Sequence, residues 1–196
     1  AFGDLAFTLA KLCRLVVGRA TTLKLIETSF YGPLKPFASW MAIPIVAALS
    51  DEFDRSTDAK AARQFLKDMG VDYNDRDTDE QKHYGSSITV DMTGNLDADH
   101  LRHASIRGTL TEGHLMISRI NDFDKLYFEP KGHTVFFSYD DRPGILGRIG
   151  AAMAEAGINI DDVRNPHDSK GRQSLAFLKV NKAVPEDVIK RVAKDI

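Results

Sequence analysis

The chain has 196 residues, which is enough for one large or two small domains with cores of their own. Its 26 basic and 28 acidic residues nearly balance, and no basic run is interleaved with aromatic residues, so we expect no nucleic-acid partner. The longest apolar stretch, residues 40–49, is too short to cross a bilayer, and the single cysteine excludes an internal disulfide. We therefore expect a cytoplasmic protein without a membrane segment.

The first part of the chain predicts a domain of mixed helices and strands. Apolar periodicity predicts four elements in this order: a helix over 2–17, a strand over 22–30, a helix over 37–53 and a helix over 58–69. Pro44 implies a break or a kink in the second helix. Because the first helical pattern begins at Ala1, we expect the chain to be a fragment of a longer protein.

A polar, acidic stretch over 72–82 follows, and after it β-like runs separated by turn residues predict a meander. These runs cover 86–92, 105–110, 115–120 and 125–128. Residues 130–132, Pro-Lys-Gly, have the composition of a linker. We therefore predict two domains, 1–131 and 132–196.

The second domain is predicted to start with a strand over 134–139. Pro143 suits a first helical position, Asp141 can cap the free N–H groups and Gly157 suits a left-handed helix end, so we predict a helix between them. The elements that follow are a strand beginning at 158–160, a strand over 175–180 and a helix from Pro185. The predicted fold class is α/β (α+β).

The turn before that helix offers both kinds of group that a free amino acid requires. Backbone N–H groups at the helix start suit a carboxylate, since orphan donors and the helix dipole favour negative charge there; they belong to Gly144, Ile145 and Leu146. Asp141 can accept from the ammonium group. The alternative interpretation is that Asp141 only caps the helix and that Asn159 only bonds its own turn.

Two motifs in this region resemble the ACT domain, the amino-acid-binding regulatory module of many biosynthetic enzymes. They are Asp-Arg-Pro-Gly at 141–144 and Gly-Ile-Asn-Ile at 157–160. The resemblance implies a ferredoxin-like βαββαβ fold, of which the last strand is missing here, and edge-to-edge pairing of two chains. It also implies that Tyr139, Asp141 and Asn159 line the effector pocket, with Arg142 either beside the effector carboxylate or exposed to solvent.

The preceding part resembles the intervening regulatory domain of long-form D-3-phosphoglycerate dehydrogenases. The matching phrases include 31–32, 68–71, 108–110 and 119–123, in this order before the ACT motifs. The resemblance implies a regulatory fragment that senses L-serine or a related small amino acid, forms homo-oligomers through its ACT domains and acts on its own catalytic domain. The parent enzyme would oxidise 3-phosphoglycerate with NAD in the first step of serine synthesis, and the fragment itself would hold no cofactor.

The same resemblance implies an anion, such as substrate phosphate, in the first domain. Arg107, Arg119 and Lys125 are the candidate ligands, because guanidinium groups on one sheet face could clamp a phosphate in bidentate geometry. Ordinary solvated charges are the alternative. Neither a phosphate-binding glycine loop nor a Ser-His-Asp arrangement can be identified, so we expect no catalytic residue and no metal site.

Three other functions remain compatible with these residues. One is the regulatory part of an iron-sulfur L-serine dehydratase, which can combine similar modules. Another is a free-standing ACT protein that binds amino acids without an attached enzyme. The third is a scaffold in which both domains only hold the parent's oligomer together.

Overall fold

The computed structural model describes residues 1–196, which divide into two compact units, Ala1–Asn121 and Asp122–Ile196. Each unit has its own sheet and its own helices, so the predicted α+β class is confirmed. The predicted boundary at residues 131 and 132 falls inside the second unit, and the assignment of the two domains to particular functions stays a prediction. No helix in the structure is both long enough and apolar enough to cross a bilayer.

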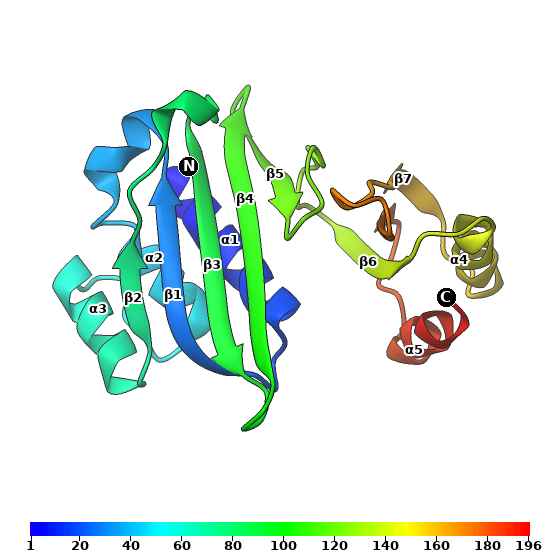
Figure 1. The fold of residues 1–196 in the computed structure, drawn as a ribbon, viewed down its shortest axis with the longest axis horizontal. Helices are drawn as coiled ribbons and strands as arrows, with labels where there is room; N and C mark the ends of the chain where they lie inside the picture. Colours follow the sequence, from blue (N-terminus) through cyan, green and yellow to red (C-terminus); the bar gives the residue numbers. More distant parts are fainter. The chain divides into compact units, whose positions relative to one another are not determined.

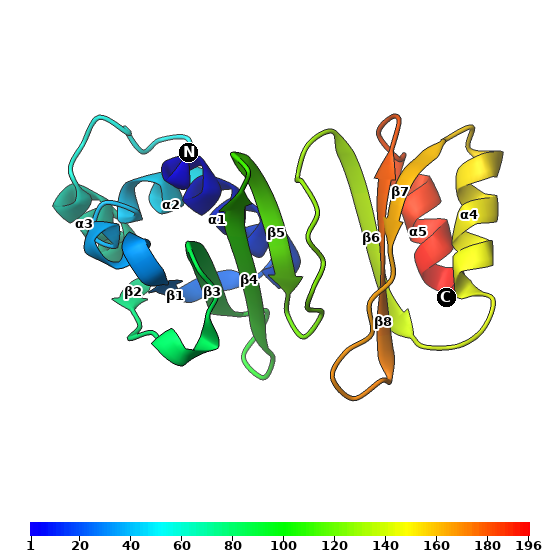
Figure 2. The same ribbon diagram turned by 90° about the horizontal axis from the view of Figure 1, so that it is seen from above.

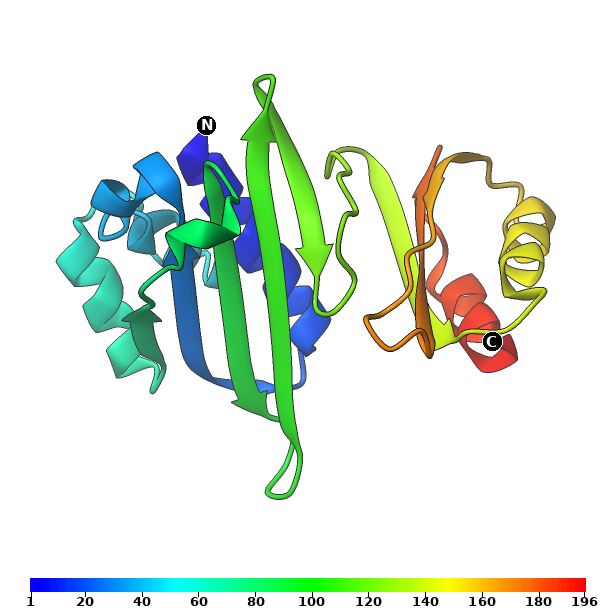
Figure 3. The same ribbon diagram turned by 45° about the horizontal axis from the view of Figure 1, so that its top comes forward.

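The first unit is built on a mixed five-stranded sheet in the order β2-β1-β3-β4-β5 (Figures 1 and 3). Its strands are β1 (Thr22–Phe30), β2 (Asp72–Asp75), β3 (Ser87–Asn95), β4 (Leu101–Thr111) and β5 (His114–Ile120). Strands β3, β4 and β5 pair consecutively and antiparallel, which confirms the first three strands of the predicted meander. Strand β2 pairs in parallel with β1.

Helices α1 (Phe2–Val17) and α2 (Ala42–Leu49) lie behind this sheet in Figure 1 and cover one of its faces. Leu5, Leu9 and Cys13 of α1 are fully buried. A Cβ atom added to Gly108 would lie 2.9 Å from a methyl carbon of both Leu5 and Leu9, so α1 rests directly on the backbone of β4. Each such leucine contributes about 1.5–3 kcal/mol by its burial, and this face carries the core of the unit.

The first two predicted elements agree with α1 and β1 at both ends. The predicted helix over 58–69 corresponds to α3 (Ala59–Asp68), where the Asp58 carboxylate accepts from the Ala61 N–H at 2.7 Å. The helix predicted over 37–53 is wrong: a 3-10 helix, η1 (Gly32–Phe37), precedes the shorter α2. Pro44 lies in the first turn of α2, where an N–H would have no intrahelical partner, so it neither breaks nor kinks the helix.

The strand predicted over 125–128 is also wrong, because no named strand forms there. The acidic stretch over 72–82 instead begins with β2 and contains a short 3-10 helix, η2 (Glu80–Lys82). Four mostly polar residues carry no apolar alternation, and they form a strand because β1 offers an edge for pairing.

The second unit has a three-stranded antiparallel sheet in the order β6-β8-β7, formed by β6 (His133–Asp140), β7 (Ile160–Arg164) and β8 (Gln173–Val180). Helices α4 (Ile145–Glu155) and α5 (Glu186–Asp195) lie together on one face of this sheet (Figure 2). The core between them includes Val135, Ile149 and Val192. The order β-α-β-β-α matches the predicted ACT topology without its last strand, which leaves β6 and β7 at the two edges.

The other face of this sheet carries a second apolar layer. Phe177 of β8 is buried, and its ring centre lies 3.7 Å from that of Phe128 in the segment that precedes β6. The Nε atom of Arg164 donates to the carbonyl oxygen of Leu126 at 3.3 Å. Residues of this segment therefore pack within the second unit, which explains why the division between the units precedes the predicted linker.

Candidate functional site

The turn between β6 and α4 has a different geometry from the one predicted. The N-cap residue of α4 is Gly144, with φ of 89° in the left-handed region, and α4 begins at Ile145. Pro143 therefore precedes the helix instead of starting it. Asp141 does not cap the helix, since α4 has no side-chain cap. A glycine at Gly144 lets the chain reverse sharply there, because left-handed φ carries little cost without a Cβ atom.

This turn presents unpaired donors at the start of α4. The first N–H groups of any α-helix lack intrahelical partners, and in α4 no side chain satisfies them. Ile145 is a core residue at 1% exposure, so it offers only its backbone, while Leu146 and Arg142 are exposed. The donors and the positive end of the helix dipole favour an anionic group at this position.

The Asp141 carboxylate, in the same turn, is held by residues from β8 and from the loop that precedes it. Its Oδ1 atom accepts from the Ser174 hydroxyl at 2.9 Å, and its Oδ2 atom lies 3.6 Å from Nδ1 of His167. The same Nδ1 atom is 2.7 Å from Ser174 Oγ. The Asp141 side chain is 41% exposed, so a ligand can still reach it.

Tyr139 belongs to the core under α4 and is 5% exposed. Its hydroxyl accepts from the Asn165 amide at 2.8 Å, and that amide also donates to the Leu175 carbonyl at 3.0 Å. The ring of Tyr139 therefore anchors the end of β6, and its contact with an effector stays a prediction.

Asn159 lies at the opposite end of the sheet from Asp141. Tyr139 pairs with Ser174, whereas Ile160 pairs with Val180, and these two levels are about 20 Å apart at roughly 3.3 Å per strand residue. The Asn159 side chain donates to the Asp161 carboxylate at 2.9 Å, as the alternative interpretation expected. One chain alone thus brings together Asp141 and the start of α4, but not Asn159.

The sequence interpretation missed Ser174, His167 and Asn165. They are joined to the β6 end by the register of β8, which no local pattern reveals. The polar run 165–168 before a strongly apolar strand was the only available signal.

In the first unit, the two candidate anion-binding arginines lie opposite each other. Arg107 pairs with Arg119 across β4 and β5, and Thr89 of β3 pairs with Arg107 on the other side. Arg107 is 7% exposed, and its guanidinium lies 3.9 Å from the ring centre of Tyr84. The buried hydroxyl of Thr89 has no hydrogen-bond partner. Lys125, the third candidate, belongs to the second unit.

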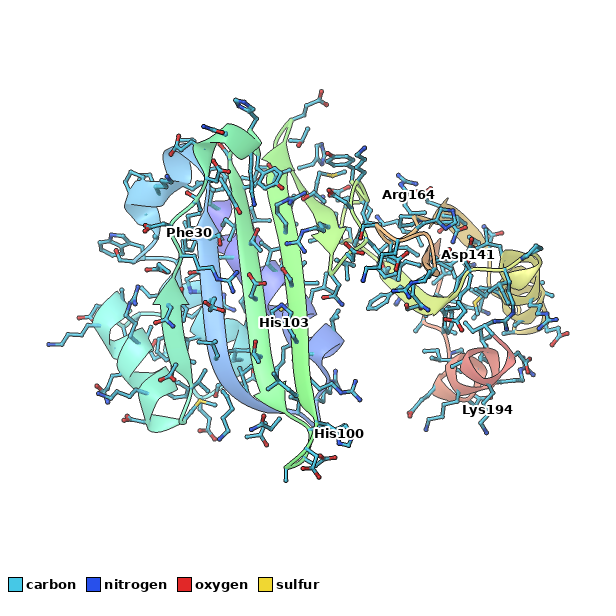
Figure 4. All side chains as sticks on the ribbon, viewed as in Figure 1. Phe30, His100, His103, Asp141, Arg164 and Lys194 are labelled. Atoms are coloured by element: carbon cyan, nitrogen blue, oxygen red, sulfur yellow. The ribbon has the colours of Figure 1, made fainter.

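The residues Thr89, Arg107 and Arg119 form a rung across the sheet face that α1 does not cover. The same face also carries an ion-pair network. The Arg76 guanidinium donates through Nε to Glu27 at 2.9 Å and lies 3.5 Å from Asp91, whose side chain is 6% exposed. His103, near the middle of this face in Figure 4, also pairs with Asp91, at 3.5 Å. No group of three or more His, Cys, Asp or Glu side chains is arranged to hold a metal ion.

This network makes the stability of the first unit depend on pH. Hydrogen bonds from Arg76 lower the pKa of Glu27, so the pair stabilises the fold above the unfolded pKa of about 4.3 and loses its effect as pH falls through the lower, folded pKa. We expect Arg76→Gln to lower the free energy of unfolding at pH 7 by about 1–3 kcal/mol, because the buried Asp91 loses a charged partner. Urea unfolding at pH 7 and pH 3 measures this, and the deficit should shrink at pH 3.

A matched control is Arg63→Gln, which removes the half-exposed pair with Asp75. Its expected cost is below about 1 kcal/mol, since exposed ion pairs contribute little. Equal costs for the two variants at pH 7 would contradict the role given to the buried Asp91 carboxylate.

The fold and the turn geometry together define the class of the second unit. Residues 133–196 match the ACT domain family, so this part of the chain is an ACT domain. The chain as a whole is similar to D-3-phosphoglycerate dehydrogenase of Bacillus subtilis, with 24% identity over 87% of this chain and 30% of the relative.

Two other proteins of the same name are also similar. That of Methanocaldococcus jannaschii is 27% identical over 64% of this chain and 23% of its own length. That of Archaeoglobus fulgidus is 25% identical over 68% of this chain and 25% of its own length. The chain thus spans less than a third of the length of these relatives.

Proposed function

We propose that this chain is a regulatory region of a D-3-phosphoglycerate dehydrogenase and that its ACT domain binds L-serine, or a related small amino acid, between two copies of the chain. The ACT match and the names of the similar proteins support the regulatory assignment over an iron-sulfur L-serine dehydratase. In this proposal the chain holds no cofactor, and the catalytic domain of the parent enzyme uses NAD to oxidise 3-phosphoglycerate.

The observation that carries the proposal is the half-exposed Asp141 carboxylate beside the uncapped start of α4. An amino acid presents a carboxylate and an ammonium group on neighbouring atoms. The N–H groups of Ile145 and Leu146 suit the carboxylate, and Asp141 suits the ammonium group through a charge-assisted hydrogen bond.

Pairing of two chains through β7 would bring Asn159 to this site. Strand β7 is at the edge of the sheet, and β6 and β7 both run antiparallel to β8, so they are parallel to each other. Asn159 precedes the start of β7, and Asp141 follows the end of β6, at the other end of the sheet. In an antiparallel β7–β7 pair related by two-fold symmetry, the start of one β7 meets the end of the other. Each Asn159 would then approach the partner's turn.

Such a site would couple ligand binding to pairing. An amino acid that touches both chains stabilises the paired state by its differential affinity for that state. Regulation of the parent follows if the paired state restricts its catalytic domain.

The test uses complementation between two defective variants. Calorimetry of the 196-residue chain with L-serine and glycine should give heat for the wild type, and weak or no heat for Asp141→Asn and Asn159→Ala separately. A refolded mixture of the two variants should regain wild-type affinity in part of its sites, because each mixed dimer contains one site with both residues intact. If the mixture regains no binding of L-serine, a site shared between two chains is contradicted. If a wild-type dimer gives no heat, the scaffold function is favoured.

For the first unit, we propose that the rung formed by Thr89, Arg107 and Arg119 binds an anion such as a phosphate ester. The unpartnered Thr89 hydroxyl, opposite a buried guanidinium, is the observation that favours it. The same calorimetry with 3-phosphoglycerate tests this, since Thr89→Val should weaken any heat seen with the wild type. The contribution of Lys125 stays a prediction.

A further inference from the structure

We infer that Ser174 and His167 position the Asp141 carboxylate as the ammonium acceptor of the ACT site and link amino-acid binding to protonation of His167. The inference rests on the proposed amino-acid site and deepens it. Neither residue belongs to the Arg-Pro-Gly turn or to the Asn-bearing strand. Both come from the region where the β7–β8 loop, residues 165–172, meets the start of β8.

This loop is fixed in place by hydrogen bonds to its surroundings. His167 and Ser174 form an isolated backbone bridge, and Asp168 accepts from the backbone N–H groups of Arg172 and Gln173 at 2.8 and 3.1 Å. The backbone N–H and hydroxyl of Ser169 both donate to Asp122, at 2.9 and 2.7 Å. The imidazole of His167 is therefore held against Ser174 by several independent contacts.

The hydrogen atoms of the Asp141–Ser174–His167 network can be assigned by counting donors. An ionised carboxylate only accepts, and the Ser174 hydroxyl has one hydrogen, which it donates to Asp141 at 2.9 Å. The contact of 2.7 Å between Ser174 Oγ and His167 Nδ1 then requires the nitrogen to donate. Neutral His167 therefore carries its hydrogen on Nδ1.

This arrangement is not that of a hydrolase. Ser174 is fully buried and donates to the carboxylate instead of to the imidazole, so no base activates its oxygen. The network can only orient the Asp141 carboxylate. It fixes one oxygen of the Asp141 carboxylate on Ser174, while the Asp141 side chain stays 41% exposed.

Protonation of His167 changes the charge of the site. A cationic imidazole lies 3.6 Å from Asp141 Oδ2 and competes with the ligand's ammonium group for the same carboxylate. The other charged residues on the neighbouring elements are Asp140 at the end of β6, Arg142 in the turn, Asp168, Lys170 and Arg172 in the loop of His167, and Asp122, which accepts from Ser169 of that loop.

Hydrogen bonds from the Gln173 backbone lower the pKa of Asp168, so that group stays ionised above pH 5. Imidazole is the side chain whose ordinary pKa lies between pH 5.5 and pH 8, and His167 places an imidazole beside the Asp141 carboxylate. Amino-acid binding should therefore weaken as the pH falls through this range.

Calorimetry with L-serine from pH 5.5 to pH 8 tests the link. We expect the wild-type affinity to fall about 10-fold on going from pH 8 to pH 5.5. Whatever its affinity at pH 8, His167→Asn should show no fall in affinity at lower pH, because the asparagine amide can occupy the position of Nδ1 but carries no titratable proton. Ser174→Ala should bind more weakly at both pH values and keep the dependence on pH.

His133→Asn is the matched control, since His133 is an exposed histidine at the far end of β6. It should keep the wild-type dependence on pH. The inference is overturned if His167→Asn keeps the full fall, or if His133→Asn abolishes it equally.

A measurement without ligand separates this inference from the proposed function. In the nitrogen NMR spectrum of the free chain at pH 8, His167 should show a protonated Nδ1, and Ser174→Ala should reduce that tautomer's share. If no amino acid gives heat at any pH, the proposed function fails together with the pH link, while the tautomer still reports whether the positioning network exists. If L-serine binds and His167→Asn keeps the same dependence on pH as the wild type, this inference is contradicted while the proposed function stands.

Discussion

Asp141→Asn is expected to weaken the binding of L-serine about 30- to 150-fold, because the ammonium group loses a charge-assisted hydrogen bond of about 2–3 kcal/mol. The substitution keeps an oxygen at Oδ1 that can accept from the Ser174 hydroxyl, so the turn should hold its geometry. It removes only the negative charge that the ligand needs. Calorimetry at pH 8 measures the loss directly.

The adjacent Asp140 supplies a matched control for this prediction. Asp140 pairs with Gln173 across β6 and β8, and its carboxylate accepts a hydrogen bond from the Gln173 side chain. It lies one residue away from Asp141 of the proposed site. Asp140→Asn removes the same charge from the preceding residue, the last of β6, and is expected to change the affinity less than about 3-fold. Equal losses for the two variants would mean that the general negative potential matters, and not a hydrogen bond to the ligand.

Gly94→Ala is expected to destabilise the first unit by about 3 kcal/mol or more, which corresponds to a fall in Tm of about 10 °C. A Cβ atom at Gly94 would lie 2.3 Å from the Thr22 carbonyl oxygen, so the backbones of β1 and β3 would have to separate. Strand backbones cannot move aside as a flexible side chain can, because their hydrogen bonds fix the spacing. Calorimetric thermal unfolding measures the effect.

Gly3→Ala is the control within the same unit, since a Cβ atom there meets no atom within 4 Å. Its expected effect is neutral or slightly stabilising, because alanine favours a helix over glycine by up to about 1 kcal/mol. The second unit should keep its stability in both variants. A Gly94→Ala chain that melts at the wild-type temperature would show that β1 and β3 approach each other less closely at this point.

Local patterns predicted most elements of the fold. The apolar face of α1 and the alternation of β1 gave both ends of each element, and Asp58 marked the start of α3, because these signals act between residues close in sequence. The two errors in the strand predictions have one origin. Residues 72–75 and 125–128 take their conformations from strand β1 and from Phe177, which are distant in sequence.

The candidate site divides in the same way. From the chemistry of neighbouring residues, the sequence indicated that Asp141 and the N–H groups at the start of α4 can bind the two charged groups of a zwitterion. It also led to a wrong expectation, that Asp141 caps the helix, because a capping oxygen and a ligand-binding oxygen look alike in a linear pattern. The structure instead bonds Asp141 to Ser174, which is 33 positions away in the sequence.

By itself, the sequence determined the order and type of most elements, the turn at 141–144 and the residues that can carry charge there. Only the tertiary structure decided that Gly144 reverses the chain, that Ser174 and His167 orient Asp141, and that Asn159 lies at the opposite end of the sheet. The physical reason is that hydrogen-bond partners across a sheet are set by strand register. Register depends on which apolar faces pack together over the whole unit, and not on the residues next to each donor or acceptor.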